Sequence, residues 1–248
     1  SSPETFYRSV ISEANFYRRA AGYFSSGIFN LFRIEYLDFA LRGGKIELVC
    51  SNHLTIDDIQ TLQNHELEKR IDRDILEEVK LMEINDLTNN ALSFFATLLK
   101  NGTLKIKIAS YTTGGLFHDK TGIFSDELNN HISFRGSSNE TYMGWSEKGN
   151  FETLETFCSW KIEDEKSVNN NKKYLKNIWN NKHSGLEVQK LSDISIKKLI
   201  SKAHDEIDDF RPILERNAAK KEKNKNQRTL MPFQLETINN WKKNMHKG

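Results

Sequence analysis

The chain has 248 residues, of which 37% are hydrophobic and 28% are charged, and its formal net charge is +2. This composition is typical of a globular domain with an apolar core, and it excludes a disordered or fibrous chain. Because no apolar run approaches the ~20 residues of a membrane span and no signal-peptide pattern is visible, we expect a cytoplasmic protein without a membrane partner.

Helical and strand patterns alternate in the first half of the sequence. Apolar residues at helical spacing predict helices over residues 4–19, 27–42, 55–83 and 87–99. Short apolar runs predict strands over residues 20–24, 45–51 and 104–109. Glycines that follow two of these helices, in Gly43-Gly44 and Asn101-Gly102, are expected to end them.

A β-hairpin is the clearest pattern in the second half. Its strands are expected over Lys120–Phe124 and His131–Arg135, joined by a polar turn. A further strand is expected over residues 151–162, and helices over 169–182 and 193–217. Together the elements predict an α/β fold, a mixed β-sheet flanked by helices, with additional helices toward the C-terminus.

Polar groups suited to a phosphate gather around this hairpin. His118 and Lys120 are two residues apart, so their side chains leave an extended segment by the same face. The hairpin brings Ser137 and Asn139 toward that face, after Gly136, a small residue that allows the backbone to approach a bound group. An imidazole, an ammonium, a hydroxyl and an amide around one point can together neutralise and hold a phosphoryl group.

This combination resembles the signature of the phospholipase D superfamily, His-x-Lys-x4-Asp followed by Gly-Ser-x-Asn. The later Asn150-Phe151-Glu152 is similar to the Asn-x-Glu of the superfamily's nuclease-like branch. The sequence departs from the signature at one position, because Ser125 stands where the Asp is expected and Asp126 follows one residue late. In the family that Asp is a supporting residue and not the nucleophile.

The resemblance implies a metal-independent phosphodiesterase that works through a phosphohistidine and needs no cofactor. His118 would attack phosphorus, and Lys120 would supply positive charge. Glu152 would orient His118 through its other ring nitrogen, with Glu155 as the reserve candidate. The residues expected to contact the phosphoryl oxygens or the rest of the substrate are Ser137, Asn139, Ser138 and Arg135, and for Arg135 a surface role is equally open.

The implied chemistry also needs a second imidazole, which protonates the leaving oxygen. His118-x-Lys120 is the sole His-x-Lys in the sequence. A homodimer that shares one active site across a two-fold axis would supply the missing half.

The C-terminal region differs in composition from the rest. Residues 216–229 are rich in Lys and Arg and poor in apolar side chains, which is typical of a solvated linker, with a phosphate-contacting arm as the less favoured alternative. Residues 230–248 resemble the entry segment of superfamily-2 helicases, in which an aromatic-Gln pair (here Phe233-Gln234) precedes the nucleotide-binding motif. Because no such motif follows, ATP is expected only for a helicase part outside this sequence.

These observations divide the chain into a phospholipase D-like nuclease domain over residues 1–165, a helical extension over 166–215, the basic linker and the helicase-like segment. We expect it to cleave nucleic acid, with DNA favoured, as the nuclease module of a helicase-coupled restriction or anti-phage defence protein. Two alternatives stay open. One is a module that binds nucleic acid without cleaving it. The other is a phospholipid phosphodiesterase, which is disfavoured because no basic amphipathic interfacial helix is visible.

Overall fold

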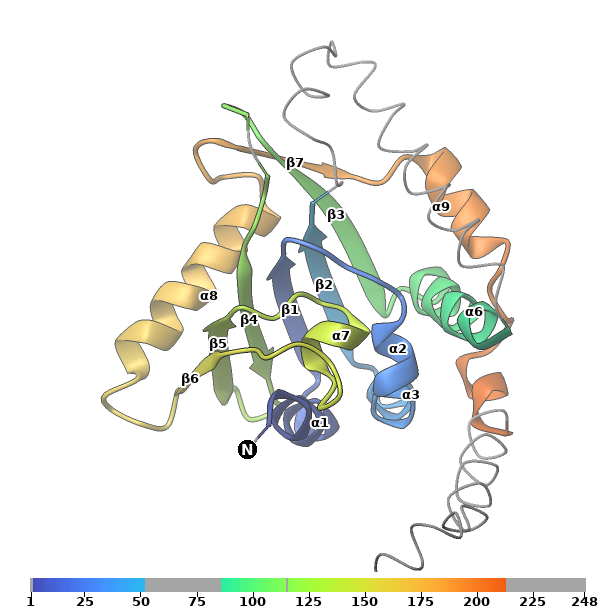
Figure 1. Cartoon of the computed structure of the whole chain (residues 1–248), viewed down its shortest axis with the longest axis horizontal. Helices are drawn as coiled ribbons and strands as arrows, with labels where there is room; N and C mark the ends of the chain where they lie inside the picture. Colours follow the sequence, from blue (N-terminus) through green and yellow to red (C-terminus); the bar gives the residue numbers. More distant parts are fainter. Residues whose placement is uncertain (1, 52–85, 115, 213–248) are drawn as a thin grey trace, which may run out of the picture. The chain divides into compact units, whose positions relative to one another are not determined.

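A seven-stranded mixed β-sheet forms the centre of the structure, which is a computed structural model that describes residues 2–51, 86–114 and 116–212 (Figure 1). Its strands lie in the order β6-β5-β4-β1-β2-β3-β7. The expected helix over residues 55–83 and the segments 216–229 and 230–248 lie outside the described residues. The strands are β1 (Phe16–Ala21), β2 (Lys45–Cys50), β3 (Leu104–Tyr111), β4 (Lys120–Ser125), β5 (His131–Gly136), β6 (Leu154–Cys158) and β7 (Leu186–Lys190).

Helices cover both faces of this sheet (Figure 1). One face packs against α8 (Glu165–Trp179), whose Val168 and Leu175 join a buried cluster with Ala20 of β1 and Ile123 of β4. No helix among the described residues is long and apolar enough to cross a membrane. The remaining helices are α1 (Pro3–Glu13), α2 (Ile28–Leu31), α3 (Arg33–Leu41), α6 (Asp86–Lys100), α7 (Tyr142–Trp145), α9 (Asp193–Ile200) and the 3-10 helix η1 (Ile207–Asp209).

Aromatic side chains fill the layer between the opposite face of the sheet and α1, α2, α3 and α7. Tyr7 of α1 lies edge-on to Tyr17 of β1 and Phe124 of β4, with ring centroids 5.7 and 5.4 Å apart. Phe134 of β5 meets Trp145 of α7 in the same geometry at 5.6 Å. Because all five rings are buried, they hold these helices on the sheet by apolar burial and by edge-to-face ring contacts.

The strand pairing places the candidate motif at one end of β1. Strands β1, β2 and β3 run parallel, and the other neighbours run antiparallel. In the β1–β4 register Arg19 is opposite Gly122 and Ala21 is opposite Lys120. The carboxyl end of β1 therefore lies beside the start of β4, two residues after His118. In open α/β sheets this carboxyl edge is where ligands gather.

The expected mixed sheet flanked by helices is confirmed, and so are several of its elements. The hairpin forms as β4 and β5, and the helix expected over residues 87–99 forms as α6. The strands expected over residues 45–51 and 104–109 form as β2 and β3. Each of these has a clear apolar pattern and a polar or glycine-containing boundary, and these two signals are sufficient for the assignment.

The beginning of the chain differs from the prediction. The helix expected over residues 4–19 ends at Glu13, and the strand expected over 20–24 begins earlier, at Phe16. Ala14 marks the change with an extended backbone, φ −71° and ψ 150°. Tyr17 falls at helical spacing in the sequence, but the pairing of β1 with β2 and β4, both distant along the chain, draws this segment into the sheet.

Three later elements also differ from the prediction. The single helix expected over residues 27–42 is interrupted at Phe32, whose φ of −118° and ψ of 39° separate α2 from α3. The strand expected over 151–162 is shortened to β6, because its only neighbour, β5, is itself six residues long. The helix expected over 193–217 ends at Ile200, within the described part of that range, and a short 3-10 helix follows.

A strand that was not predicted completes the sheet. β7 lies within residues 166–215, which were expected to be helical, and it pairs antiparallel with β3 from Lys107↔Lys190 to Tyr111↔Leu186. Its sequence, Leu-Glu-Val-Gln-Lys, is short and largely polar, as suits an edge strand. The described residues up to Phe210 form one compact unit, so α8, β7 and α9 belong to the same unit as the rest of the sheet.

A buried carboxylate, Glu140, joins the sheet to the helices of its aromatic face. It is 2% exposed and forms an ion pair with Arg19 of β1, with 3.1 Å between Nε and Oε2. Burial, and then the charge of Glu140, raise the pKa values of the surrounding tyrosines well above the ordinary value, so their hydroxyls stay protonated and can donate. The other donors to its carboxylate are Tyr7, Tyr17, Tyr36 and the indole of Trp145.

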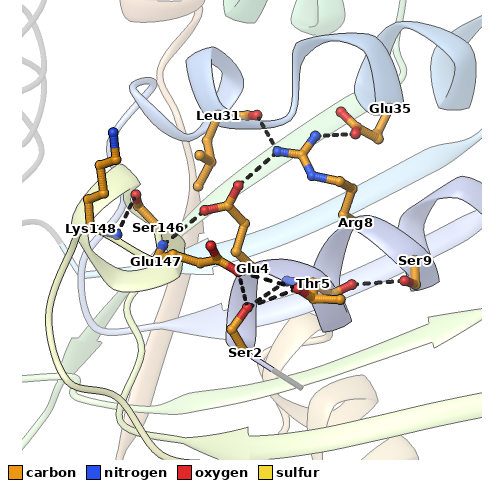
Figure 2. A network of polar contacts seen from close by, with 10 residues as sticks. All are labelled: Ser2, Glu4, Thr5, Arg8, Ser9, Leu31, Glu35, Ser146, Glu147 and Lys148. Atoms are coloured by element: carbon orange, nitrogen blue, oxygen red, sulfur yellow. Dashed lines mark hydrogen bonds and ion pairs between the residues drawn. The ribbon is translucent and has the colours of Figure 1, made fainter. Parts of the chain in front are cut away.

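A second polar network ties the outer side of α1 to the segment after α7 (Figure 2). Glu4 accepts from the backbone N–H of Glu147 at 2.9 Å, and the Glu147 carboxylate accepts from the Ser2 hydroxyl at 2.7 Å. One turn further along α1, Arg8 forms an ion pair with Glu35 of α3. Through these contacts α1 holds both α3 and the segment after α7.

Replacing the buried carboxylate tests how far the fold depends on it. Glu140→Ala should lower the free energy of unfolding by about 3–5 kcal/mol, because it leaves the Arg19 guanidinium buried without its counter-charge. Urea denaturation followed by circular dichroism measures the change. Glu163→Ala removes an exposed acid and is the matched control, with an expected change within about 0.5 kcal/mol. Equal stabilities of the two variants would contradict the role of Glu140.

Candidate active site

The two motif side chains at the start of β4 are in contact. Lys120 Nζ lies 2.9 Å from His118 Nε2. His118 is exposed and Lys120 is half-buried. Because a lysine ammonium can only donate, Nε2 of His118 accepts this hydrogen bond, which places the proton of the neutral ring on Nδ1. The lone pair of Nε2 is therefore directed at the ammonium.

The residue between them turns to the opposite face of the sheet. Asp119 accepts from the backbone N–H of Thr121 at 2.7 Å and from the hydroxyl of Tyr174 in α8. This alternation leaves His118 and Lys120 together on the face away from α8, as their spacing predicts. The contact with Tyr174 also fixes the backbone that carries both motif side chains.

The end of β1 brings His118 and Asn139 together. Gly22, directly after β1, is so close to His118 that a Cβ there would lie 3.0 Å from the ring carbon Cδ2. The next residue, Tyr23, donates its backbone N–H to Oδ1 of Asn139 at 3.0 Å. Two consecutive backbone positions therefore contact the histidine and the asparagine of the expected motif.

Gly136 is required by a close approach within the chain. A Cβ at this position would lie 2.1 Å from the backbone oxygen of Thr153, so the backbone approaches the neighbouring segment of the chain, and the expected approach to a bound group stays a prediction. Ser137 continues this pairing, because its N–H donates to the Thr153 carbonyl at 3.1 Å and its hydroxyl accepts from the Thr153 N–H at 2.9 Å. The close backbone approach fixes Ser137 beside the segment that carries Glu152.

The Glu152 carboxylate is held within its own segment and by Ser137. It accepts from the Ser137 hydroxyl, and from the side-chain amide of Asn150 at 3.3 Å. A hydrogen bond between Glu152 and His118 is not among the contacts of the described residues, so the orienting role of Glu152 stays a prediction. Glu155 lies opposite Arg135 in the β5–β6 register, which places it on the other face of the sheet from Lys120.

The two expected substrate contacts are not brought together with His118. The Arg135 guanidinium lies 5.6 Å from the ring centre of Tyr174, on the face that α8 covers. Ser133, two residues earlier on β5, accepts from Asn171 of α8 at 3.1 Å, which confirms the direction of this face. Ser138 does lie inside the motif, but its side chain is buried, with 1% exposure of the residue.

The late aspartate of the motif caps the hairpin turn. Asp126 Oδ1 accepts from the backbone N–H groups of Leu128 and Asn130 at 2.9 and 2.8 Å, and Oδ2 accepts from the Asn130 side chain at 2.8 Å. These hydrogen bonds, the one from the Asn130 side chain foremost, hold the pKa of Asp126 below its ordinary value. Ser125 and Asp126 lie at the turn of the hairpin, at the opposite end of β4 from Lys120. This position therefore supports the turn and not the site.

Arg19 is the residue of this region that the sequence analysis missed. It is 1% exposed, and its Nη2 donates to the Ser138 carbonyl at 2.5 Å. In the helix expected over residues 4–19, Arg19 is an ordinary polar residue at the C-terminal end. In a strand over residues 16–21, Arg19 shares a face with the apolar Tyr17, and this is the signal that indicates a buried charge.

The charge at the site is concentrated on Lys120. Burial lowers the pKa of its ammonium, and the positive charge of Arg19 lowers it further, while Asp119 and Glu152 act in the opposite direction. Among the described residues, no group of three or more His, Cys, Asp or Glu side chains is placed to hold a metal ion.

Comparison with known proteins gives limited likenesses. No protein-family profile and no curated protein matches the sequence. Among solved structures, the chain is similar to NucT from Helicobacter pylori, with 18% identity and a TM-score of 0.40 over 71% of this chain and 86% of that one. It is similar to a phospholipase D family member, Nuc from Salmonella typhimurium, with 13% identity and a TM-score of 0.41 over 75% of this chain and 90% of that one. It is also similar to a phosphatidylserine synthase from Haemophilus influenzae, with 12% identity and a TM-score of 0.42 over 86% of this chain and 43% of that one. At these values the likenesses assign no activity to the chain.

The environment of Lys120 makes its titration a direct test of the site. Because burial and Arg19 both destabilise the charged form, its proton should leave below the ordinary lysine pKa of 10.5. NMR titration of the ¹³Cε resonance of labelled lysines measures this value, and the signal that disappears in Lys120→Arg identifies the residue. A measured pKa at or above 10.5 would mean that Lys120 is solvated and remote from Arg19.

Proposed function

We propose that this chain is a phosphodiesterase that cleaves nucleic acid without a metal ion, through a phosphohistidine. The observation that carries the proposal is the 2.9 Å contact between Lys120 Nζ and His118 Nε2, with Asn139 held beside the end of β1 by Tyr23 and Ser137 held by Thr153. A neutral imidazole next to a fixed cation is the arrangement that nucleophilic attack on a phosphodiester needs.

The first step uses the hydrogen bond that Lys120 now gives to His118. As a phosphodiester binds, the ammonium transfers its hydrogen bond to a phosphoryl oxygen, which frees the lone pair of Nε2. That lone pair forms the N–P bond while the bond from phosphorus to the leaving oxygen breaks. A second imidazole, in its protonated form, gives its proton to the leaving oxygen. The side-chain NH2 of Asn139 donates to the phosphoryl oxygens, and the Ser137 hydroxyl does the same once it turns away from Glu152, so both stabilise the charge that builds up there.

The second step returns the site to its starting form. A water molecule attacks phosphorus and loses a proton to the second imidazole, which is now neutral. The N–P bond breaks, its electron pair returns to Nε2 of His118, and the product leaves as a phosphate monoester. The net reaction consumes one water molecule for each bond cleaved, and no cofactor takes part.

The second imidazole in this proposal comes from a second copy of the chain. His118-x-Lys120 is the sole His-x-Lys in the sequence. A two-fold axis between the His118 residues of a homodimer places identical groups on both sides of one phosphorus. Nucleic acid, with DNA first, is the proposed substrate because the motif resembles the nuclease-like branch and because residues 230–248 resemble the entry segment of a helicase. The same resemblance supports a role within a helicase-coupled defence protein.

A module that binds nucleic acid without cleaving it is the second candidate. The observation in its favour is that the Glu152 carboxylate contacts Ser137 and Asn150, whereas its orienting contact with His118 is absent from the described part of the chain. An imidazole that is not oriented still offers a polar partner to a phosphate, and Lys120 still offers its charge.

Separate measurements of cleavage and binding distinguish these candidates. His118→Ala should reduce the cleavage of labelled DNA or RNA in excess EDTA by at least about 10³-fold, because it removes the nucleophile. Its affinity for the same nucleic acid, measured by fluorescence anisotropy, should change by less than about threefold. Glu163→Ala, which removes an exposed side chain away from the motif, is the control and should leave both values unchanged. Cleavage by wild type that strictly requires added Mg²⁺ would contradict the metal-free mechanism.

The shared site has a quantitative consequence. When wild-type and His118→Ala chains are unfolded together and refolded, they should pair at random, and only pairs of two wild-type chains hold both imidazoles. Activity per total protein should therefore fall as the square of the wild-type fraction. A linear fall, or an active monomer by sedimentation at the assay concentration, would show that one chain carries a complete site.

A further inference from the structure

Arg19 keeps one hydrogen-bonding group unused although it is buried. Its Nε donates to Glu140 and its Nη2 donates to the Ser138 carbonyl. Its Nη1 is buried and has no hydrogen-bond partner among the described residues. A buried polar group without a partner costs about 1–3 kcal/mol, and more when it is charged, so such groups are rare in folded proteins.

A second unused group belongs to the residue that Arg19 holds. The hydroxyl of Ser138 is also buried and without a hydrogen-bond partner in the described part of the chain. Ser138 stands between Ser137 and Asn139, the two expected phosphate ligands. These two unsatisfied groups belong to residues in direct contact, one of them inside the candidate motif, and they are the two buried side-chain polar atoms without a partner among the described residues. Such exceptions gather at functional sites.

The charge balance around Glu140 leaves Arg19 available for another purpose. The Glu140 carboxylate already accepts from three tyrosine hydroxyls and the Trp145 indole, which would satisfy its oxygens without an arginine. Arg19 contributes to this cluster through a single N–H, from Nε, and not through a two-pronged contact. A neutral donor at position 19 would serve the buried carboxylate, but it would bring no charge to the motif.

The position of Arg19 on β1 places its positive charge near the motif. Arg19 is opposite Gly122 in the β1–β4 register, and Ala21, two residues on, is opposite Lys120, so the side chains of Arg19 and Lys120 share one face of the sheet. The ring of Phe134 covers Gly122, where a Cβ would lie 2.2 Å from it, and the Arg19 guanidinium lies 4.9 Å from the centre of the same ring. The positive charge of Arg19 also acts on Lys120, whose pKa it helps to lower. Two neighbouring cations repel each other until an anion binds beside them, which gives both a reason to favour phosphate.

We propose that Arg19 is a positioning residue of the phosphate site, which adds a second positive charge beneath Lys120 and holds the Ser137–Asn139 segment through the Ser138 carbonyl. This inference rests on the proposed function, because it assigns Arg19 to the same phosphate. Arg19 acts through Lys120 and Ser138 and does not touch the reacting atoms. Its buried position in a low-dielectric layer makes its charge stronger at the site than that of a solvated arginine.

The test must separate this role from the structural pairing of Arg19 with Glu140. Glu140→Gln keeps the arginine and neutralises its partner. Arg19→Met/Glu140→Gln removes both charges while it keeps most of the buried volume, so no unpaired ion remains. Arg18→Met is the control, since the neighbouring arginine pairs with Glu47 instead. Each variant is examined as the full 248-residue chain, with folding checked by circular dichroism.

Inorganic phosphate is the probe, with its dissociation constant measured by calorimetry beside the rate of nucleic-acid cleavage. Relative to Glu140→Gln, the double variant should bind phosphate about tenfold more weakly and cleave about 10²-fold more slowly. The Lys120 pKa should also rise, because the charge that lowers it is gone. Arg18→Met should match wild type. Equal phosphate affinity and equal Lys120 pKa in the double variant and in Glu140→Gln would overturn the role of Arg19.

A measurement on the wild-type chain covers the case in which the double variant does not fold. The Nε–H resonance of Arg19, slow to exchange because it is buried, should shift as ¹⁵N-labelled protein is titrated with inorganic phosphate, and the absence of a shift at saturation would overturn the proposal. The proposed function and the role of Arg19 are contradicted by different results. A wild-type chain that binds phosphate but never cleaves nucleic acid would remove the proposed chemistry and leave the phosphate subsite standing.

Discussion

The burial of one ion pair, between Glu140 and Arg19, is the constraint on which the rest of this structure depends. The carboxylate gathers donors from α1, α3, α7 and β1, which are far apart in the sequence. An ionised pair in an apolar layer is stable only when its geometry and its remaining hydrogen bonds are nearly complete. Many packings of α1, α3 and α7 on the sheet would bury a similar apolar area. The ion pair favours one of them, because few others would also bring all of these donors to the carboxylate.

That constraint also places the candidate active site. Glu140 directly follows Asn139, so holding Glu140 under the helices holds the end of the Gly-Ser-Ser-Asn segment. The segment is fixed at its other end by the close contact of Gly136 with the backbone of Thr153. Between the two anchors, Ser137 and Asn139 have little freedom. Rigid support of this kind lets a small number of polar groups act on one phosphate with little reorganisation.

The contact between Lys120 and His118 connects this geometry to chemistry. It engages the lone pair of Nε2. In the proposed reaction the same ammonium would move to a phosphoryl oxygen, and this exchange of acceptors would free the imidazole for attack while the phosphate charge is neutralised. In the proposed role of Arg19, its charge would favour the bound anion over the free site.

The sequence by itself determined the mixed sheet with its helices and the hairpin, and it predicted His118, Lys120, Ser137 and Asn139 as candidate site residues. These depend on local signals, namely apolar periodicity, turn residues and the spacing of polar side chains along a strand. Tertiary structure decided what depends on partners distant in the chain. It turned residues 16–21 into a strand, made β7 an edge of the sheet, and moved Arg135 and Glu155 to the face away from Lys120. It also made Arg19 a buried partner of Glu140, because only the folded chain brings residues separated by more than a hundred positions into one ion pair.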